Sequence, residues 1–153
     1  MISYTTIVNN LKSAASDLTA VNTVGFGSID KLDADAQNAA YPYVFFRPLT
    51  SPGIGFNSNS PNMYGPRRVN FEMYVMDIPK LTDSDMVDVM SNCEQIGYDV
   101  LSRYYDGTLE PTEGIYQTSI IPLFEAFQDR VGGWVFNIQI ETSAAGITSC
   151  NRI

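Results

Sequence analysis

Val131-Gly-Gly-Trp-Val-Phe-Asn-Ile-Gln-Ile-Glu-Thr142 is the stretch that decides the fold of this 153-residue chain. Large apolar side chains recur at every second position along it, so they share one face of an extended segment. Residues 115–127 predict an antiparallel partner strand, joined to it near Gln128-Asp-Arg130. The two segments therefore predict a terminal β-hairpin, whose second strand presents one apolar face of Trp134, Phe136, Ile138 and Ile140.

The hairpin carries two signals about its surroundings. Pro122 lies inside the first strand, and proline cannot donate a hydrogen bond to a neighbouring strand. Such a strand is expected at a sheet edge or at a bulge. The pair Gly132-Gly133 follows the turn directly and predicts a β-bulge there.

Further strands are expected upstream. Residues 67–76 alternate regularly, with Val69, Phe71, Met73 and Val75 on one face, which is typical of a half-buried strand. The run Tyr43-Val-Phe-Phe-Arg47 favours a buried strand. Residues 24–29 predict a short strand or a turn leading into one.

Two amphipathic helices are expected over residues 2–20 and 82–105, where apolar side chains recur at helical spacing. Ser3 is the expected N-cap of the first helix. Gly97 lies within the apolar stripe of the second, which predicts a close contact with its backbone. Residues 33–40 are expected to form a single helical turn.

Together these elements predict an α+β fold. Its sheet is mostly antiparallel, is packed by an N-terminal helix and a second amphipathic helix, and closes with a β-hairpin. The length fits one domain with a sizeable core. We expect a single domain over residues 1–142 and a C-terminal tail or arm over residues 143–153.

Residues 50–66 are the least ordinary stretch. Twelve of these seventeen residues are Gly, Pro, Ser or Asn and none is charged, so they predict a long loop. One interpretation is a floppy hairpin connection. The other is an arm that orders on a neighbouring subunit, with Phe56 and Tyr64 at the subunit interface.

The net charge of −8 is unevenly placed. Residues 1–76 carry five basic and five acidic side chains, whereas residues 77–153 carry four basic and twelve acidic ones. A module that grips nucleic acid needs a basic footprint, so this distribution argues against one. It is compatible with a surface that meets a basic protein partner or repels passing nucleic acid.

The sequence offers no constellation for chemistry. It contains no histidine, the commonest general base and transition-metal ligand. Neither Gly25-Phe-Gly27 nor Gly53-Ile-Gly55 extends to a dinucleotide fingerprint, and Cys93 and Cys150 lack metal-like spacing. We therefore expect no catalytic residue, cofactor or metal, and no enzyme.

No apolar run approaches the roughly 20 residues that span a bilayer. No apolar segment follows a basic patch at the N-terminus, where a secretory signal would place one. We expect a soluble protein that is made in a cytoplasm and has no membrane contact.

Arg67-Arg68 is the only basic pair and lies at the mouth of the 50–66 loop. Three interpretations stand: a solubilising strand start that blunts a sheet edge, a salt link to the acidic helix of a neighbouring subunit, or a contact with DNA phosphate. On the second interpretation Arg67 and Arg68 join Phe56 and Tyr64 at the subunit interface.

The 82–105 helix has a polar stripe without a basic residue, which includes Asp85, Asp88 and Asp99. Its acidic first turns suit the positive end of the helix dipole. The stripe is either a solvated face or a face directed toward a charged partner or a lumen.

The order of elements resembles the tail terminator or tail-completion proteins of tailed bacteriophages, together with related head–tail connector ring proteins. The resemblance covers nearly the whole chain and follows a pattern of elements rather than an invariant signature. An N-terminal helix and a helix of the Asp88–Tyr104 kind accompany three segments: Tyr41-Pro-Tyr-Val-Phe-Phe46, Arg68-Val-Asn-Phe-Glu-Met-Tyr-Val75 and Asp129-Arg-Val-Gly-Gly-Trp-Val-Phe-Asn-Ile-Gln-Ile-Glu141.

The resemblance implies a structural virion protein at the neck or tail, assembled in the host bacterial cytoplasm. It implies a homo-oligomeric ring, six-fold or twelve-fold, that contacts other connector or tail proteins. Genome DNA would pass through the lumen without sequence-specific binding. The family supplies no catalytic residue to carry over.

Two alternatives remain open. One is another virion component, such as a tail tube or head-completion protein. The other is a monomeric cellular binding module that uses residues 50–66 to hold a peptide or small ligand. Stoichiometry separates the ring readings from the monomeric one.

Overall fold

A computed structural model describes residues 3–36, 38–51, 53–56, 64–79, 86–108, 114–126 and 131–142. The predicted α+β class is confirmed. In chain order the elements are α1 (Tyr4–Ser16), β1 (Thr23–Phe26), α2 (Ile29–Ala36), β2 (Tyr43–Pro48), β3 (Gly53–Phe56), β4 (Tyr64–Asp77), α3 (Met86–Thr108), β5 (Gly114–Ala126) and β6 (Val131–Thr142).

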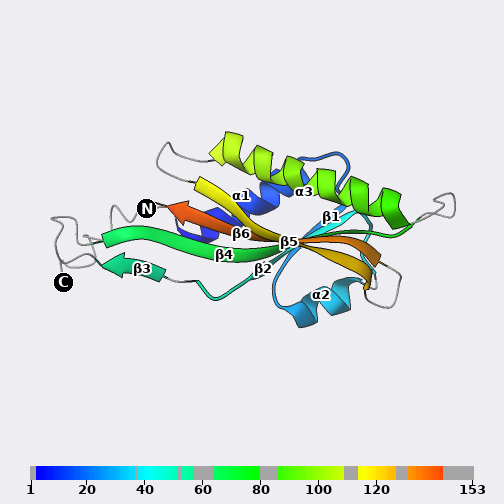
Figure 1. The fold of residues 1–153 in the computed structure, drawn as a ribbon, viewed down its shortest axis with the longest axis horizontal. Helices are drawn as coiled ribbons and strands as arrows, with labels where there is room; N and C mark the ends of the chain where they lie inside the picture. The colour runs from blue at the N-terminus through cyan, green and yellow to red at the C-terminus, as the bar shows by residue number, and fades with distance from the viewer. Residues whose placement is uncertain are drawn as a thin grey trace.

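The strands form one sheet in the order β1-β2-β4-β6-β5, and β3 pairs with β4 beside this path. Among the described strands only β1 and β2 are parallel, so the sheet is mostly antiparallel as predicted. Helices α1 and α3 cover one face, and α2 lies against the other (Figure 1). The sheet therefore has one face under two helices and one face that is largely open.

The main core lies between the two helices and the sheet. The first helix begins as predicted, because the Ser3 side chain accepts a hydrogen bond from the backbone N–H of Thr6 at 3.1 Å. The alternation seen in the sequence puts the predicted faces of β4 and β6 inward. The fully buried side chains of this core include Ile7, Leu11, Val44, Phe46, Phe71, Met73, Val75, Cys93, Val100, Phe136 and Ile140.

The close helix contact predicted from Gly97 is confirmed. A Cβ at this position would collide with the ring of Phe136, which is fully buried in β6. The missing side chain lets α3 approach the sheet. The Trp134 indole N–H also donates to the carbonyl of Met90 at 2.8 Å, which fixes α3 over β6.

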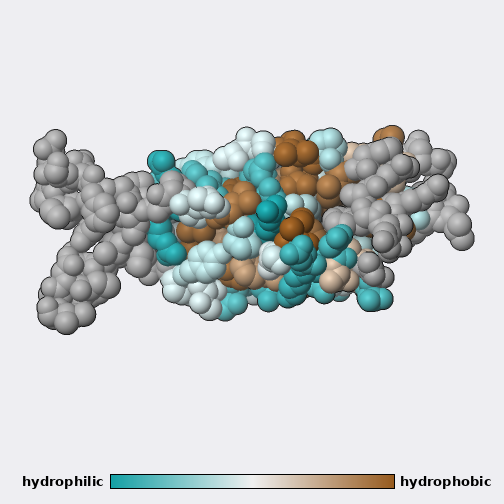
Figure 2. Space-filling view, turned by 90° about the horizontal axis from the view of Figure 1, so that it is seen from below, coloured by the Kyte–Doolittle hydropathy of each residue, from teal (hydrophilic) through white to brown (hydrophobic). Residues whose placement is uncertain are grey.

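The opposite face holds a smaller core under α2. Leu32 packs there with Tyr43, Phe45, Tyr74 and Met76. Away from α2, strands β2, β4 and β6 carry polar side chains on the same face. Its side chains pair across strands through the Arg47–Glu72 ion pair (3.2 Å) and a bond from Gln139 to Asn70 (3.0 Å). Figure 2, seen from below, shows hydrophobic and hydrophilic surface intermingled on this side.

Strand β5 is the sheet edge that Pro122 predicted. It is also bulged, because its register against β6 shifts between Gln117 and Ser119 and again between Leu123 and Ala126. Each shift leaves one extra residue on β5. A bulge near the turn is therefore confirmed, but the extra residue lies on β5 and not at Gly132-Gly133.

Three predicted boundaries were wrong. The predicted 50–66 loop contains β3 and the first residues of β4. Backbone pairing with β4 stabilises β3, although Gly53 and Gly55 have low strand propensity and the sequence pattern therefore did not indicate a strand. The turn expected at 33–40 is α2, which begins at Ile29. The first helix ends at Ser16, since the chain must turn there to enter β1. The expected cap at Thr82 and the tail at 143–153 lie outside the described residues.

Cys93 gives the fold a predicted pH dependence. Burial, with a smaller effect of the Asp77 charge, raises the pKa of its thiol from 9.0 to about 12. The folded state keeps the proton that the unfolded state loses, so this stability is complete below pH 9 and falls as pH rises toward about 12. The Tyr43 pKa, raised by burial from 10.0 to about 12, adds to the loss only above pH 10.

Urea unfolding between pH 8 and 10 checks this expectation. The free energy of unfolding should decline with pH in the parent protein, and the decline should flatten in the Cys93→Ala variant. An identical slope in both proteins would show that the thiol is not the titrating group.

Candidate functional site

The first candidate is a two-stranded hairpin arm, defined here as β3 with the facing residues 64–68 of β4. Its register pairs Gly53 with Arg68, Ile54 with Arg67 and Phe56 with Tyr64. Within the described part of the chain, β4 is the only element with which β3 makes an extensive contact. The side chains of the predicted interface residues Phe56 and Tyr64 lie outside the described residues, so their role stays a prediction.

Arg67 and Arg68 stand at the base of the arm and point to opposite faces. The Arg68 Nε lies 3.1 Å from a carboxylate oxygen of Glu141, its partner in the β4–β6 register. Arg67 has the parity of Val69 and therefore points to the helix-covered face. On that face, burial raises the pKa of the Tyr4 hydroxyl, and the Arg67 charge offsets a smaller part of this rise.

The edge interpretation of this arginine pair is wrong. At Arg67 and Arg68, β4 is flanked by β3 on one side and by β6 on the other. The pair therefore blunts no edge. Arg68 is half-exposed, and it pairs with Glu141 within the same subunit.

The acidic stripe of α3 is exposed where it is described. Asp88 lies in the first turn, and Asp99 lies three turns later on the same side of the helix. Asp99 accepts a hydrogen bond from the amide of Gln95 at 2.9 Å. Asp85 lies outside the described residues. The solvated-face interpretation and the lumen or partner interpretation of this stripe both stand.

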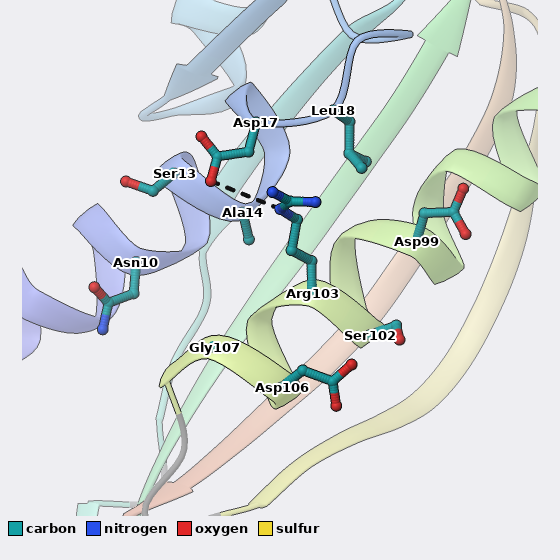
Figure 3. A pocket seen from close by; sticks show the side chains of 10 residues that line it. All are labelled: Asn10, Ser13, Ala14, Asp17, Leu18, Asp99, Ser102, Arg103, Asp106 and Gly107. Atoms are coloured by element: carbon teal, nitrogen blue, oxygen red, sulfur yellow. Dashed lines mark ion pairs between the residues drawn. The ribbon is translucent and has the colours of Figure 1, made fainter.

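A groove of about 640 Å³ runs between α1 and α3 (Figure 3). Arg103 spans it toward Asp17, with 3.6 Å between Nε and the carboxylate oxygen. Asp99 and Asp106 line the same groove, which therefore carries a net negative charge. Both ends of the ion pair are exposed by more than half, so the pair contributes little to stability.

The described residues hold no group of three or more His, Cys, Asp or Glu side chains placed to bind a metal ion. None of the helices in the described ranges combines the length and the apolar composition that crossing a bilayer requires.

The sequence reasoning missed three exposed apolar side chains on α3. Val87, Tyr98 and Tyr105 are spaced by three and two helical turns, so they share one flank. This is the flank away from α1, since α3 meets α1 through Asp99 and Arg103. The tyrosines escaped notice because they border the core stripe. Their common spacing was the signal that could have found them.

No protein-family model matches the chain, and no curated protein matches it.

Proposed function

We propose that this chain is a structural virion protein of a tailed bacteriophage, and that copies of it form a ring at the head–tail junction. The ring is six-fold or twelve-fold, meets other connector or tail proteins and lets the genome pass without sequence-specific binding. The chain would be assembled in the host bacterial cytoplasm and would act in the neck or tail of the virion.

The hairpin arm carries this proposal. A two-stranded hairpin alone is at best marginally stable in water. This arm lies at the end of the sheet away from α2, and its outer strand has β4 as its principal neighbour in the described chain (Figure 1). Packing on a second subunit would stabilise the two paired strands of the arm. Extended arms of this kind suit a protein that works as an assembly.

The charge distribution supports the same reading. Arg68 stands at the base of the arm, and the exposed stripe of Asp88 and Asp99 lies on α3. An acidic surface facing a lumen repels the DNA backbone and keeps it from adhering.

The mass of the assembly tests the proposal. It is measured in solution across a concentration series and by imaging of native particles. We expect a closed ring in at least one setting. A variant lacking residues 53–66 should keep its fold, because β2 and β4 still pair through Leu49 and Asn70, yet should assemble at least about tenfold more weakly, a loss of about 1.4 kcal/mol.

Arg68→Ala and Arg47→Ala form a matched pair for the same assay. Both arginines pair with a glutamate across neighbouring strands, but only Arg68 lies at the arm. Each should lower folding stability by about 1 kcal/mol or less. Only Arg68→Ala should weaken assembly. Equal assembly of both variants would remove Arg68 from the interface, and a monomer in both settings would overturn the ring.

A monomeric binding module is the second candidate. The acidic α1–α3 groove favours it, because its volume falls within the range of ligand sites. The groove is open, and most of its lining residues are polar or charged, unlike most such sites. A monomer of constant mass that binds a basic peptide, with the binding lost on Asp99→Asn, would favour this function over the ring.

A further inference from the structure

Exposed apolar side chains gather on one lateral side of the molecule. Among the described residues, seven large hydrophobic side chains are exposed, and five of them lie on or beside strand β5. Three lie on the outer flank of α3 and two on β5 itself, on the sheet face opposite α1 and α3 (Figure 1). The five are Val87, Tyr98, Tyr105, Tyr116 and Ile121.

Tyrosine and apolar residues of this kind favour an interface with another protein. The Tyr98 ring meets the Phe136 ring edge to face, with centroids 5.4 Å apart, while 42% of the residue stays exposed. It is therefore held in place by the core and presented outward. Residues 114–123 of β5 contain no charged side chain, although the chain as a whole is strongly acidic. We call this side the β5–α3 side.

The β5–α3 side is not built to add another strand. Pro122 has no N–H to donate, and two extra residues interrupt the register of β5. A partner would therefore pack against the side chains and not extend the hydrogen-bonded ladder.

The opposite side of the sheet ends in β1, with α1 above it. Val8, Val24 and Phe26 are half-buried at its margin, and Ile29 is exposed. β1 is also protected against strand addition, because it has only four residues and Lys31 Nζ donates to the carbonyl of Phe26 at 3.1 Å. We call this the β1–α1 side.

The β5–α3 side and the β1–α1 side are complementary: their helices lie on the same face of the sheet, and they carry opposite charges. Helices α1 and α3 lie on the same face of the sheet, so a neighbouring copy in the same orientation brings the outer flank of α1 against the outer flank of α3. Lys12 is exposed on α1, on the flank opposite the groove residues Asn10, Ser13 and Asp17. Glu94 lies on the outer flank of α3, between Val87 and Tyr98.

We propose that the β5–α3 side of one copy packs against the β1–α1 side of a second copy, with Glu94 beside Lys12 of its neighbour. Such a contact is heterologous and closes into a ring when the rotation permits. Strands β5 and β1 run in opposite directions within the sheet, so neighbouring edges meet antiparallel. The inference rests on the proposed ring and names the surfaces that build it.

Engineered cysteines test the contact directly. In a Cys150→Ser background, Lys12→Cys and Glu94→Cys are made singly and together, and each assembled protein is oxidised with copper phenanthroline. A head-to-tail contact predicts a ladder of covalent multimers from the double variant only. Each single variant should stay monomeric on a denaturing gel, and a mixture of the two should stop at dimers. Gln95→Cys, one residue away on the helix, is the control in place of Glu94→Cys.

Each outcome decides between defined alternatives. A dimer from Glu94→Cys alone would show a two-fold contact and overturn the head-to-tail arrangement. Rings without the Lys12–Glu94 ladder would overturn this interface and leave the proposed function standing. A monomer in solution and no copy in native particles would overturn both.

Charge reversal provides a second, non-covalent measurement. Lys12→Glu and Glu94→Lys should each raise the concentration at which half the protein is assembled by about tenfold, with unchanged melting temperatures. The double reversal should restore the parent value. Two additive losses would contradict the pairing.

Discussion

Gly133→Ala is expected to lower the free energy of unfolding by about 3 kcal/mol or more, which is about 10 °C in melting temperature. Gly133 has a φ of +153°, a conformation that L side chains rarely adopt. A Cβ there would also run into the Val75 carbonyl and lie 3.1 Å from the Cα of Met76. These are backbone atoms of the central strand β4, so they cannot move aside.

Gly132→Ala is the matched control for this prediction. The atoms that a Cβ at Gly132 would meet belong to Met86, a flexible side chain whose far end can swing away. We expect a loss of about 1 kcal/mol or less. Chemical denaturation of both variants measures the contrast, and equal losses would show that the β4 backbone yields at this point.

The second large effect concerns the contact between α3 and the sheet. Gly97→Ala should destabilise the protein by about 2 kcal/mol, because the new methyl group meets the buried Phe136 ring. Gly107 lies in the same helix, and a Cβ there would have no neighbour within 4 Å in the part of the chain that the structure describes. Gly107→Ala should therefore stabilise the helix by up to about 1 kcal/mol.

Thermal unfolding of these two variants should therefore shift in opposite directions. A stabilising Gly97→Ala would mean that the Phe136 ring can turn away and that the close approach of α3 is not required. If Phe136→Leu in the Gly97→Ala background recovers part of the loss, the collision with the ring is its cause.

Local patterns predicted the elements whose signals lie within a few residues. The alternation of Val69, Phe71 and Met73 indicated a strand, and the proline at 122 indicated a strand at the sheet edge. Gly97 marked a tight contact before its partner was known. Each of these signals is a property of one segment, so the rest of the fold is not needed to interpret it.

Pairing between segments that are distant in the chain could not be predicted from the sequence. Arg68 and Glu141 form an ion pair only because β4 and β6 are neighbours in one register, although α3 and β5 lie between them in the chain. Strand β3 is a strand because it pairs with β4, and its own composition does not predict one. The candidate interface on α3 was overlooked for a related reason, since which flank of α3 lies away from α1 follows from packing and not from periodicity.

The interrupted edge of β5 bears on how copies of this chain behave when they are abundant. A continuous unpaired edge strand could pair with strands of further copies without limit, and such growth is slow to reverse. Pro122 and the two bulges oppose that route along β5, so the proposed contact between copies depends on side chains that can separate again. In the proposed ring, copies that dock wrongly could therefore leave, and we expect surplus protein not to grow into fibrils through β5. Reversible docking would give the proposed assembly a means of correcting its own errors.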